Sequence, residues 1–269
     1  MAAVGGGPAS AAGEGAAGAA AGCDRTCLLG YVQMYVDALA ANDASSLPVA
    51  AEVRYTDNGL PTEFDGSKWP KVGEIIEGSR LDFADPVLNN VASQFALRDD
   101  RGELVRYSVR LKVEAGAISE IEAMAARNGE SFIWNDGNLE PQPVFFEKPA
   151  TPNTREELIA ITNLYIDYLE GNLDQQLPAS STCGRWENGQ LMASNGNFNE
   201  PWFFVVEPRR ILVVDEELGV TFGNFPFGGT PQPEPLVVGE TFKIWGGEFQ
   251  MIQAVMRNQP SDYWTEPSP

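Results

Sequence analysis

The sequence predicts an α+β protein made of two similar units in tandem. Its 269 residues are 43% hydrophobic and 21% charged, a composition typical of a globular protein that buries a core. At about 150 residues per domain, this length fits one large domain or two small ones. Two sequence blocks recur in the same order, and in each copy a helical pattern precedes several strand patterns. This order favours helices packed on one face of a curved antiparallel sheet.

The first repeated block is an amphipathic helix. Apolar residues at helical spacing start at Leu28 in the first copy and at Leu158, 130 positions later, in the second. At the same separation, Tyr35 aligns with Tyr165. The segment from Thr154 to Glu157 has the pattern of a capping box, which predicts the start of the second helix.

Polar turns and closing strands also recur. Asp57-Asn58-Gly59 aligns with Glu187-Asn188-Gly189 at the separation of 130, and residues 111–123 align with 242–254 at a separation of 131. Blocks that recur in the same order indicate a tandem duplication. Between them we align two hairpin turns, 98–102 and 215–219. The strands expected around these turns and at the end of each unit are 92–98, 104–113, 118–125, 211–215, 220–224 and 249–256.

The duplication sets the expected domain boundaries. Residues 1–22 are almost entirely Ala and Gly and are expected to form a disordered tail. We expect the first unit over 23–128, a Pro-rich linker over 129–154 and the second unit over 155–258. Residues 259–269 form an expected C-terminal tail.

Charge limits the classes of partner. The chain has 18 Lys and Arg against 38 Asp and Glu, a net charge of −20. This charge repels nucleic acids and anionic membrane surfaces, so we expect neither as a partner. No stretch approaches the about 20 apolar residues of a membrane helix, which predicts a soluble protein. Its compartment stays open: secreted or periplasmic if a leader was removed, and otherwise cytoplasmic.

The chain contains three cysteines and no histidine. An odd number of cysteines allows at most one internal disulfide. A bridge from Cys23 or Cys27 to Cys183 would join the two halves in an oxidising compartment, and three unpaired thiols are the alternative. Without histidine the usual imidazole base and commonest metal ligand are missing, so we expect no metal and no cofactor. Acid-base chemistry then falls to Asp, Glu, Tyr, Lys or Cys.

The repeated polar turns carry the candidate catalytic carboxylates, Asp57 and Glu187. Strand alternation places Tyr55 on the same face as Asp57, and Arg185 on the same face as Glu187. If that face lines an apolar cavity, burial raises the carboxylate pKa and produces an acid or base that works near neutral pH. The alternative is that both segments are only tight Asn-Gly turns.

Other side chains complete the predicted site. Tyr35 and Tyr165 would donate a hydrogen bond to a developing oxyanion, or else pack in the core with the hydroxyl bound to backbone. The residues predicted to contact substrate surround the two turns and are Arg54, Tyr55, Asn58, Arg185, Trp186 and Asn188.

These motifs resemble the nuclear transport factor 2-like, or SnoaL-like, superfamily. The resemblance rests on the leading helix, on residues 52–59, and on a closing strand pair with a Gly turn at 111–122. Residues 183–189 and 208–219 are similar to a poorly characterised set of tandem members in bacteria and fungi. The resemblance implies cone-shaped antiparallel sheets that wrap around helices and leave an apolar pocket.

The resemblance leaves two classes of function open, because members include polyketide cyclases, dehydratases and ketosteroid isomerase as well as proteins that only bind or dimerise. We expect a cofactor-independent lyase, isomerase or cyclase that acts on a small apolar molecule, with Asp57 or Glu187 as proton shuttle. The net charge favours a neutral or cationic ligand. The alternative is a non-catalytic binding or structural module whose two units pair internally. A pocket in one half beside a buried carboxylate would favour catalysis.

Overall fold

The computed structural model describes residues 23–172, 176–198, 205–228 and 236–258. The tails predicted over 1–22 and 259–269 lie outside the described residues. Over these residues the protein has two α-helices and two seven-stranded sheets. The predicted α+β class and the two tandem sheet units are confirmed. None of the described helices is long and apolar enough to cross a membrane.

Each unit begins with a helix and continues with seven strands. The elements of the first unit are α1 (Arg25–Ala41), η1 (Ala44–Ser46), β1 (Val49–Asp57), β2 (Leu60–Thr62), β3 (Val72–Ile75), β4 (Leu81–Asp85), β5 (Asn90–Asp99), β6 (Leu104–Glu114) and β7 (Ala117–Arg127). After η2 (Pro143–Phe146), the elements of the second unit are α2 (Arg155–Leu169), β8 (Ala179–Glu187), β9 (Gln190–Ala193), β10 (Val205–Val206), β11 (Ile211–Asp215), β12 (Val220–Gly228), β13 (Leu236–Trp245) and β14 (Glu248–Asn258).

The two sheets have the same strand order. The first runs β2-β1-β7-β6-β5-β3 and the second β9-β8-β14-β13-β12-β10, with β4 and β11 added to β5 and β12. The register confirms the duplication: Asp57 pairs with Ala123, and Glu187 pairs with Ala254. The expectation of purely antiparallel sheets was wrong, because β1 runs parallel to β7 and β8 parallel to β14. The intervening strands supply the long crossover that parallel pairing needs.

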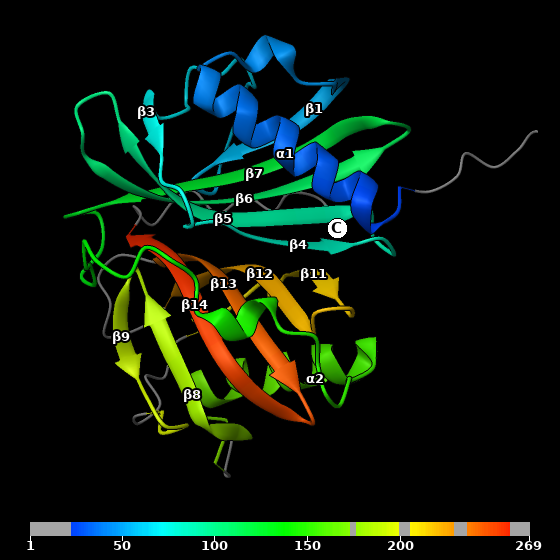
Figure 1. Cartoon of the computed structure of the whole chain (residues 1–269), viewed down its shortest axis with the longest axis vertical. Helices are drawn as coiled ribbons and strands as arrows, with labels where there is room; N and C mark the ends of the chain where they lie inside the picture. Colours follow the sequence, from blue (N-terminus) through cyan, green and yellow to red (C-terminus); the bar gives the residue numbers. More distant parts are fainter. Residues whose placement is uncertain (1–22, 173–175, 199–204, 229–235, 259–269) are drawn as a thin grey trace, which may run out of the picture.

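The sheets pack face to face in a four-layer arrangement. Figure 1 shows α1 above the first sheet and α2 below the second, with both sheets between them. β4 contacts β11 and β7 contacts β14 across the interface. The linker contributes to this layer, because Phe145 in η2 is buried in one apolar cluster with Phe83 and Phe222. Each sheet therefore has one face toward its own helix and one toward the other unit.

The ends of both helices follow local rules. The Thr154 side chain accepts a hydrogen bond from the Glu157 backbone, and Glu157 binds back to the Thr154 N–H, which confirms the predicted capping box. At the start of α1, Asp24 accepts from the backbone N–H of Cys27. Asn42 ends α1 in the left-handed conformation, where its short polar side chain is tolerated.

The predicted alignment of the central hairpins was wrong. The turn at 98–102 joins β5 to β6, whereas the turn at 215–219 joins β11 to β12. The true counterpart of 215–219 is the turn at 85–89 between β4 and β5, 130 positions earlier. At the last position of this turn the first unit has Asn89 and the second has Gly219, both at positive φ. Because the first copy lacks the glycine that is typical of such a position, its turn was not recognised in the sequence.

The disulfide joins Cys23 to Cys27 at the start of α1. Cys183 is a free thiol, fully buried in the core of the second unit. Both possibilities that the sequence left open, a bridge from Cys23 or Cys27 to Cys183 and three unpaired thiols, are therefore wrong. Strand alternation directs Cys183 toward α2, into the core and away from the first unit.

Two buried aspartates cross between the units. Asp85 at the end of β4 accepts from Arg155 of α2, at 2.6 and 2.9 Å, and from the Val214 backbone N–H at 3.0 Å. Its counterpart 130 positions later makes the reciprocal contacts. Asp215 accepts from Arg25 of α1 at 2.9 Å and from the Ala84 backbone N–H at 3.0 Å. Each unit thus binds the first turn of the other unit's helix.

We expect Asp85→Asn to lower the free energy of unfolding by about 3 kcal/mol, because it leaves the Arg155 charge without its buried partner. Asp82→Asn is the matched control on the same strand. Asp82 and its partner Arg80 are each about a quarter exposed, so its loss should cost less than about 1 kcal/mol. Urea unfolding measures both values, and equal effects would contradict a special role for the crossed pair.

Candidate functional site

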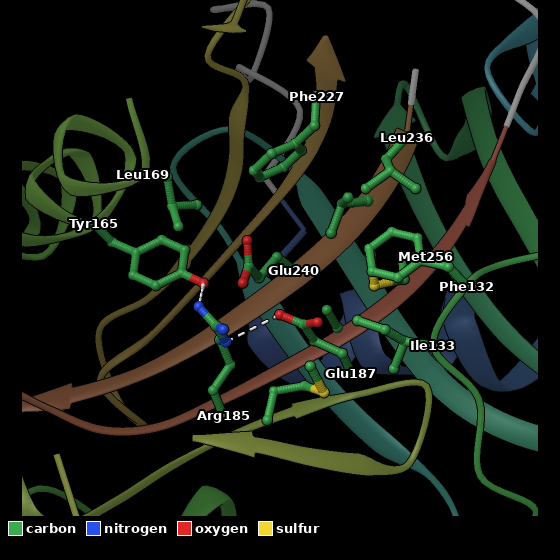
Figure 2. Close-up of a pocket in the computed structure, with 13 residues that line it drawn as sticks. Phe132, Ile133, Tyr165, Leu169, Arg185, Glu187, Phe227, Leu236, Glu240 and Met256 are labelled. Atoms are coloured by element: carbon green, nitrogen blue, oxygen red, sulfur yellow. Dashed lines mark hydrogen bonds and ion pairs between the residues drawn. The ribbon is translucent and has the colours of Figure 1, made fainter. Parts of the chain in front are cut away.

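A cavity opens inside the second unit, between its sheet and α2 (Figure 2). It offers about 40 Å³ to the centres of water molecules, which is room for roughly three waters. Most of its wall is apolar and includes Leu169, Phe227, Leu236, Val238 and Met256. Four polar side chains interrupt that wall, and they belong to α2, β8 and β13.

Three of these four side chains were predicted from the sequence. Arg185 and Glu187 share the inner face of β8, as alternation predicted, and their side chains form an ion pair at 3.0 Å. Nη1 of Arg185 donates to the hydroxyl oxygen of Tyr165 on α2 at 3.3 Å. The structure therefore brings Tyr165, Arg185 and Glu187 together in one buried row.

Glu240 is the fourth polar side chain, and the sequence analysis missed it. It lies on β13 at a fully inward position, between Val238 and Phe242 in the alternation of that strand. Figure 2 shows its carboxyl group beside Tyr165 and the Arg185–Glu187 pair. Within the described part of the chain, its buried Oε2 has no hydrogen-bond partner. An acidic residue at an apolar inward position was the available signal.

Burial sets the electrostatics of the cavity. It raises the pKa of Glu240 to about 8, and the negative charge of Glu187 adds to the effect while Arg185 opposes it. Burial also raises the pKa of Glu187, and the charge of Arg185 offsets only part of the rise. Near neutral pH the cavity therefore holds a protonated Glu240, beside a Glu187 carboxyl group that lies 3.0 Å from the Arg185 guanidinium. One carboxyl group can donate a proton while the other can accept one.

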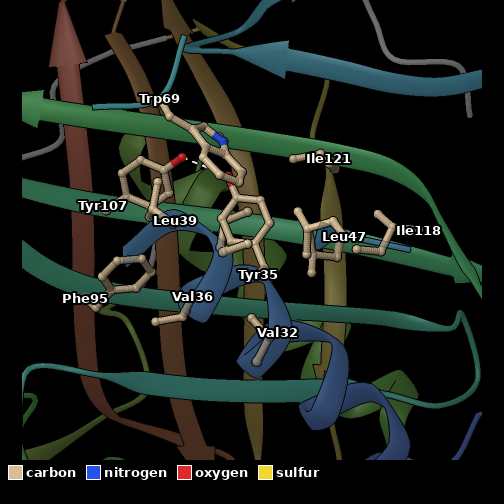
Figure 3. Close-up of a cluster of buried hydrophobic side chains, with 14 of the residues drawn as sticks. Val32, Tyr35, Val36, Leu39, Leu47, Trp69, Phe95, Tyr107, Ile118 and Ile121 are labelled. Atoms are coloured by element: carbon tan, nitrogen blue, oxygen red, sulfur yellow. Dashed lines mark hydrogen bonds between the residues drawn. The ribbon is translucent and has the colours of Figure 1, made fainter. Parts of the chain in front are cut away.

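The equivalent space in the first unit is filled by aromatic rings. Tyr35 corresponds to Tyr165, and its hydroxyl lies 2.9 Å from that of Tyr107 (Figure 3). The Tyr35 ring contacts Trp69 edge to face at 5.3 Å between centroids. Burial raises the pKa of both Tyr35 and Tyr107. Tyr35 thus lies in a packed core with its hydroxyl bound to another side chain.

Asp57 ends β1 at the position equivalent to Glu187. Burial raises its pKa, while Arg257 and a hydrogen bond from Asn58, at 3.1 Å, oppose the rise. Tyr55 shares its face and is buried in the first core, in edge-to-face contact with Phe64. The carboxylate of the first unit therefore lies beside packed rings.

Asn58 and Asn188 form tight turns, as the alternative interpretation held. Both have positive φ and are followed by glycines with positive φ, as type I′ hairpins require. The Asn58 side-chain oxygen accepts from the Ala125 N–H at 2.9 Å, and that of Asn188 accepts from Met256 at 3.0 Å. Each asparagine thereby ties its turn to the last strand of its unit.

Arg54 and Trp186 lie on the opposite faces of β1 and β8, away from the cavity. Arg54 forms an ion pair with Glu120 on β7. Trp186 lines a small polar hollow between the units, together with Gln94 and Arg106. Neither side chain contributes to the pocket wall. Among the described residues, no group of three or more Cys, Asp or Glu side chains is placed to hold a metal ion.

One protein family matches part of the chain. Its model covers residues 151–256 and is described as a domain of unknown function, DUF8021. The matched segment runs from just before α2 into β14, so the second unit, which contains the cavity, is similar to this family. A search of curated proteins found no match.

The titration of Glu240 should make the free energy of unfolding depend on pH. Its pKa rises from 4.5 to about 8 on burial. Its contribution to the free energy of unfolding is therefore complete below pH 4.5 and is lost as pH rises through 8. Glu240→Gln removes this dependence. The free energy of unfolding of the variant, relative to wild type, should therefore increase by roughly 4 kcal/mol between about pH 5 and about pH 9.

Urea unfolding at a series of pH values measures this difference. Glu248→Gln, an exposed change on the neighbouring strand β14, is the control and should give a difference that does not vary with pH. A constant difference between Glu240→Gln and wild type would contradict the buried, protonated carboxyl group.

Proposed function

We propose that the second unit binds a small, largely apolar carbonyl compound and transfers protons on it, as an isomerase or lyase that needs no cofactor. The observation that carries this proposal is the buried Glu240 carboxyl group, whose Oε2 lacks a partner among the described residues and lies in a cavity beside Glu187. A buried polar atom without a partner is costly, and a bound ligand would remove that cost.

The chemistry follows from the charge on each side chain. Glu187 is the candidate base and takes a proton from a carbon next to the substrate carbonyl. Glu187 then becomes neutral, which leaves the Arg185 charge free to stabilise the negative oxygen that forms. The neutral Glu240 carboxyl group donates a hydrogen bond to the same oxygen. Return of the proton to a different carbon completes an isomerisation and restores the ion pair.

Tyr165 positions the Glu240 carboxyl group. Arg185 donates to the Tyr165 oxygen, and the Tyr165 hydroxyl in turn hydrogen-bonds the Glu240 carboxyl group. Burial raises the pKa of Tyr165 well above its ordinary value, which keeps the hydroxyl protonated at working pH. Tyr165 is therefore a donor in this mechanism, and the proton shuttle is left to the two carboxyl groups.

The walls define the substrate. Apart from the four polar groups the lining is aliphatic, aromatic or thioether, so the body of the ligand is hydrocarbon. The site is close to neutral overall, because Glu187 offsets Arg185 and Glu240 is protonated. Phe132, on the linker, lines the cavity and is half exposed. A ligand larger than the cavity would extend along this ring.

The resemblance to the nuclear transport factor 2-like superfamily supports the same proposal. Two helix-first units with curved sheets and a pocket between sheet and helix agree with that assignment, which we retain as part of the proposal. A polyketide cyclase-like or isomerase-like activity without histidine then depends on carboxyl groups and tyrosine, the chemistry available in this cavity.

A non-catalytic module is the second candidate function. It is favoured by the first unit, where Tyr35, Trp69 and Tyr107 fill the interior and leave Asp57 beside packed rings. In that case the second cavity would bind a ligand without converting it. The two candidates make the same prediction for binding and opposite predictions for proton transfer.

Hydrogen-deuterium exchange separates the two functions. The protein is incubated in D2O with cyclohexanone or 2-tetralone, and loss of the proton next to the carbonyl is followed by NMR. Wild type should exceed the buffer rate, and Glu187→Asp should lower the rate about 100-fold because it withdraws the base while keeping its charge. Asp57→Asn, at the equivalent position of the first unit, should leave the rate unchanged.

Each other result has a defined meaning. Binding of the ketones without exchange above the buffer rate supports the non-catalytic module and refutes the enzyme. An equal loss of rate in Asp57→Asn would contradict the assignment of the site to the second unit. Thermal unfolding of Glu187→Asp checks that the Arg185 ion pair and the fold survive the change.

A further inference from the structure

One wall of the cavity comes from the linker and not from the helix and strands of the second unit. Phe132 and Ile133 lie between β7 and η2, and both line the cavity (Figure 2). Phe132 is 52% exposed, whereas Ile133 is buried in the core of the second unit. A linker keeps one conformation only where contacts offset the entropy that it loses. The contacts that hold this wall therefore decide the shape of the cavity.

The Asn-Gly turn of the second unit holds the wall on one side. The Asn188 side-chain amide donates to the Ile133 carbonyl oxygen at 3.1 Å. The Asn135 backbone N–H donates to the Asn188 carbonyl oxygen at 3.0 Å. The wall is thus bound to the turn that directly follows Glu187.

The first unit holds the wall on the other side, through Arg106 on β6. The neighbouring residues Val105 and Tyr107 belong to the first core, so alternation directs Arg106 toward the second unit. Nη2 of Arg106 donates to the carbonyl oxygens of Asn135, at 2.8 Å, and Gly137, at 2.6 Å. One side chain of the first unit therefore binds two carbonyl groups of the linker.

This contact is charged and closely packed. Arg106 is 8% exposed, and burial lowers its pKa to about 10 while Asp136 opposes the fall, so it stays positively charged near neutral pH. Hydrogen bonds from a charged donor are roughly twice as strong as neutral ones. The guanidinium carbon also lies 5.7 Å from the centre of the Trp134 ring. A Cβ atom at Gly189 would overlap the guanidinium, so this position of the turn needs a glycine.

The duplication shows that pairing of the sheets does not require an arginine at this position. Val237 corresponds to Arg106, 131 positions later. Val237 is buried against Met124 across the interface between the units. The interface therefore accepts an apolar side chain at the equivalent position, and the contacts with the linker distinguish the first copy.

We propose that Arg106 is a positioning residue for the cavity of the second unit and that it sets the size of ligand the cavity accepts. It acts through the linker, by holding Phe132 and Ile133 in place, and is not part of the cavity wall itself. With this wall in place the cavity has room for roughly three waters, so a ketone of two fused rings has to extend past Phe132. The closed wall therefore favours a compact ketone over a larger one. This inference rests on the proposed binding of a carbonyl compound in the cavity.

Amide hydrogen exchange tests the positioning role without any ligand. Arg106→Met removes both hydrogen bonds to the linker but keeps an apolar side chain in the interface. The Asn135 amide should then exchange at least about tenfold faster, because bonds from a charged donor no longer oppose local opening. Arg98→Met is the matched control, because Arg98 is exposed and donates to the Gly102 carbonyl in the turn between β5 and β6. It should leave the exchange rate unchanged.

Calorimetric titration with cyclohexanone and 2-tetralone tests the size selection. Arg106→Met should shift the ratio of the two dissociation constants toward 2-tetralone by at least about fivefold, because the compact ketone loses more of its contact with the wall. Phe132→Ala trims the wall directly and should produce the same shift. The double variant should shift the ratio no further than Phe132→Ala does, because both changes act on one wall. Arg106→Lys keeps the charge and one donor group and should recover part of the selectivity.

The outcomes separate this inference from the proposed function. Unchanged exchange at Asn135 in Arg106→Met overturns the inference even if both ketones bind to wild type. An unchanged ratio in Arg106→Met, or additive shifts in the double variant, also overturns it, because Arg106 would then not act through the wall. Absence of ketone binding to wild type would refute the proposed function together with the size selection. Circular dichroism checks that each variant is folded.

Discussion

The crossed pairs Asp85–Arg155 and Asp215–Arg25 fix the geometry on which the rest of the protein depends. Each aspartate is fully buried and binds both a helix-terminal arginine and a strand N–H of the other unit. Removing either unit would leave these charges without partners, which is costly in an apolar interface. The outward face of each sheet is therefore committed to the other unit. The cavity of the second unit accordingly lies between its sheet and its own helix.

Within that shared geometry the two interiors have diverged. Tyr107 and Val109 of β6 correspond to Val238 and Glu240 of β13, 131 positions later. The exchange removes a large ring and introduces a carboxyl group, so the same change opens space and places an ionisable group in it. The first interior is packed with rings around Tyr35 and has no carboxyl group at the position of Glu240, where Val109 lies. The stability of the packed first unit can offset the cost of the buried polar groups in the second unit, because the interface joins the two units.

Features fixed by local chemistry or by the repeat were predictable from the sequence, and those fixed by tertiary contact were not. The helices, the capping box and both Asn-Gly turns follow from spacing and turn chemistry alone. The parallel pairing of the first and last strands, and the burial of Cys183, depend on distant contacts. Glu240 was missed because no strand was predicted over β13, whose alternation of apolar residues places the Glu240 side chain inward. The nuclear transport factor 2-like assignment remains a prediction.

The Asn-Gly segments were interpreted either as tight turns or as carriers of catalytic carboxylates. In the second unit the turn and the carboxylate belong to one structural arrangement. Asn188 fills the turn, and through Met256 it fixes the end of β8 against β14. That anchoring holds Glu187, one residue earlier, at the rim of the cavity, and alternation then places Arg185 two residues deeper on the same face. A rigid turn is what a carboxylate needs if its distance to a substrate is to stay constant. The same turn in the first unit holds Asp57 beside packed rings, so the surrounding core decides whether an inherited carboxylate meets a ligand.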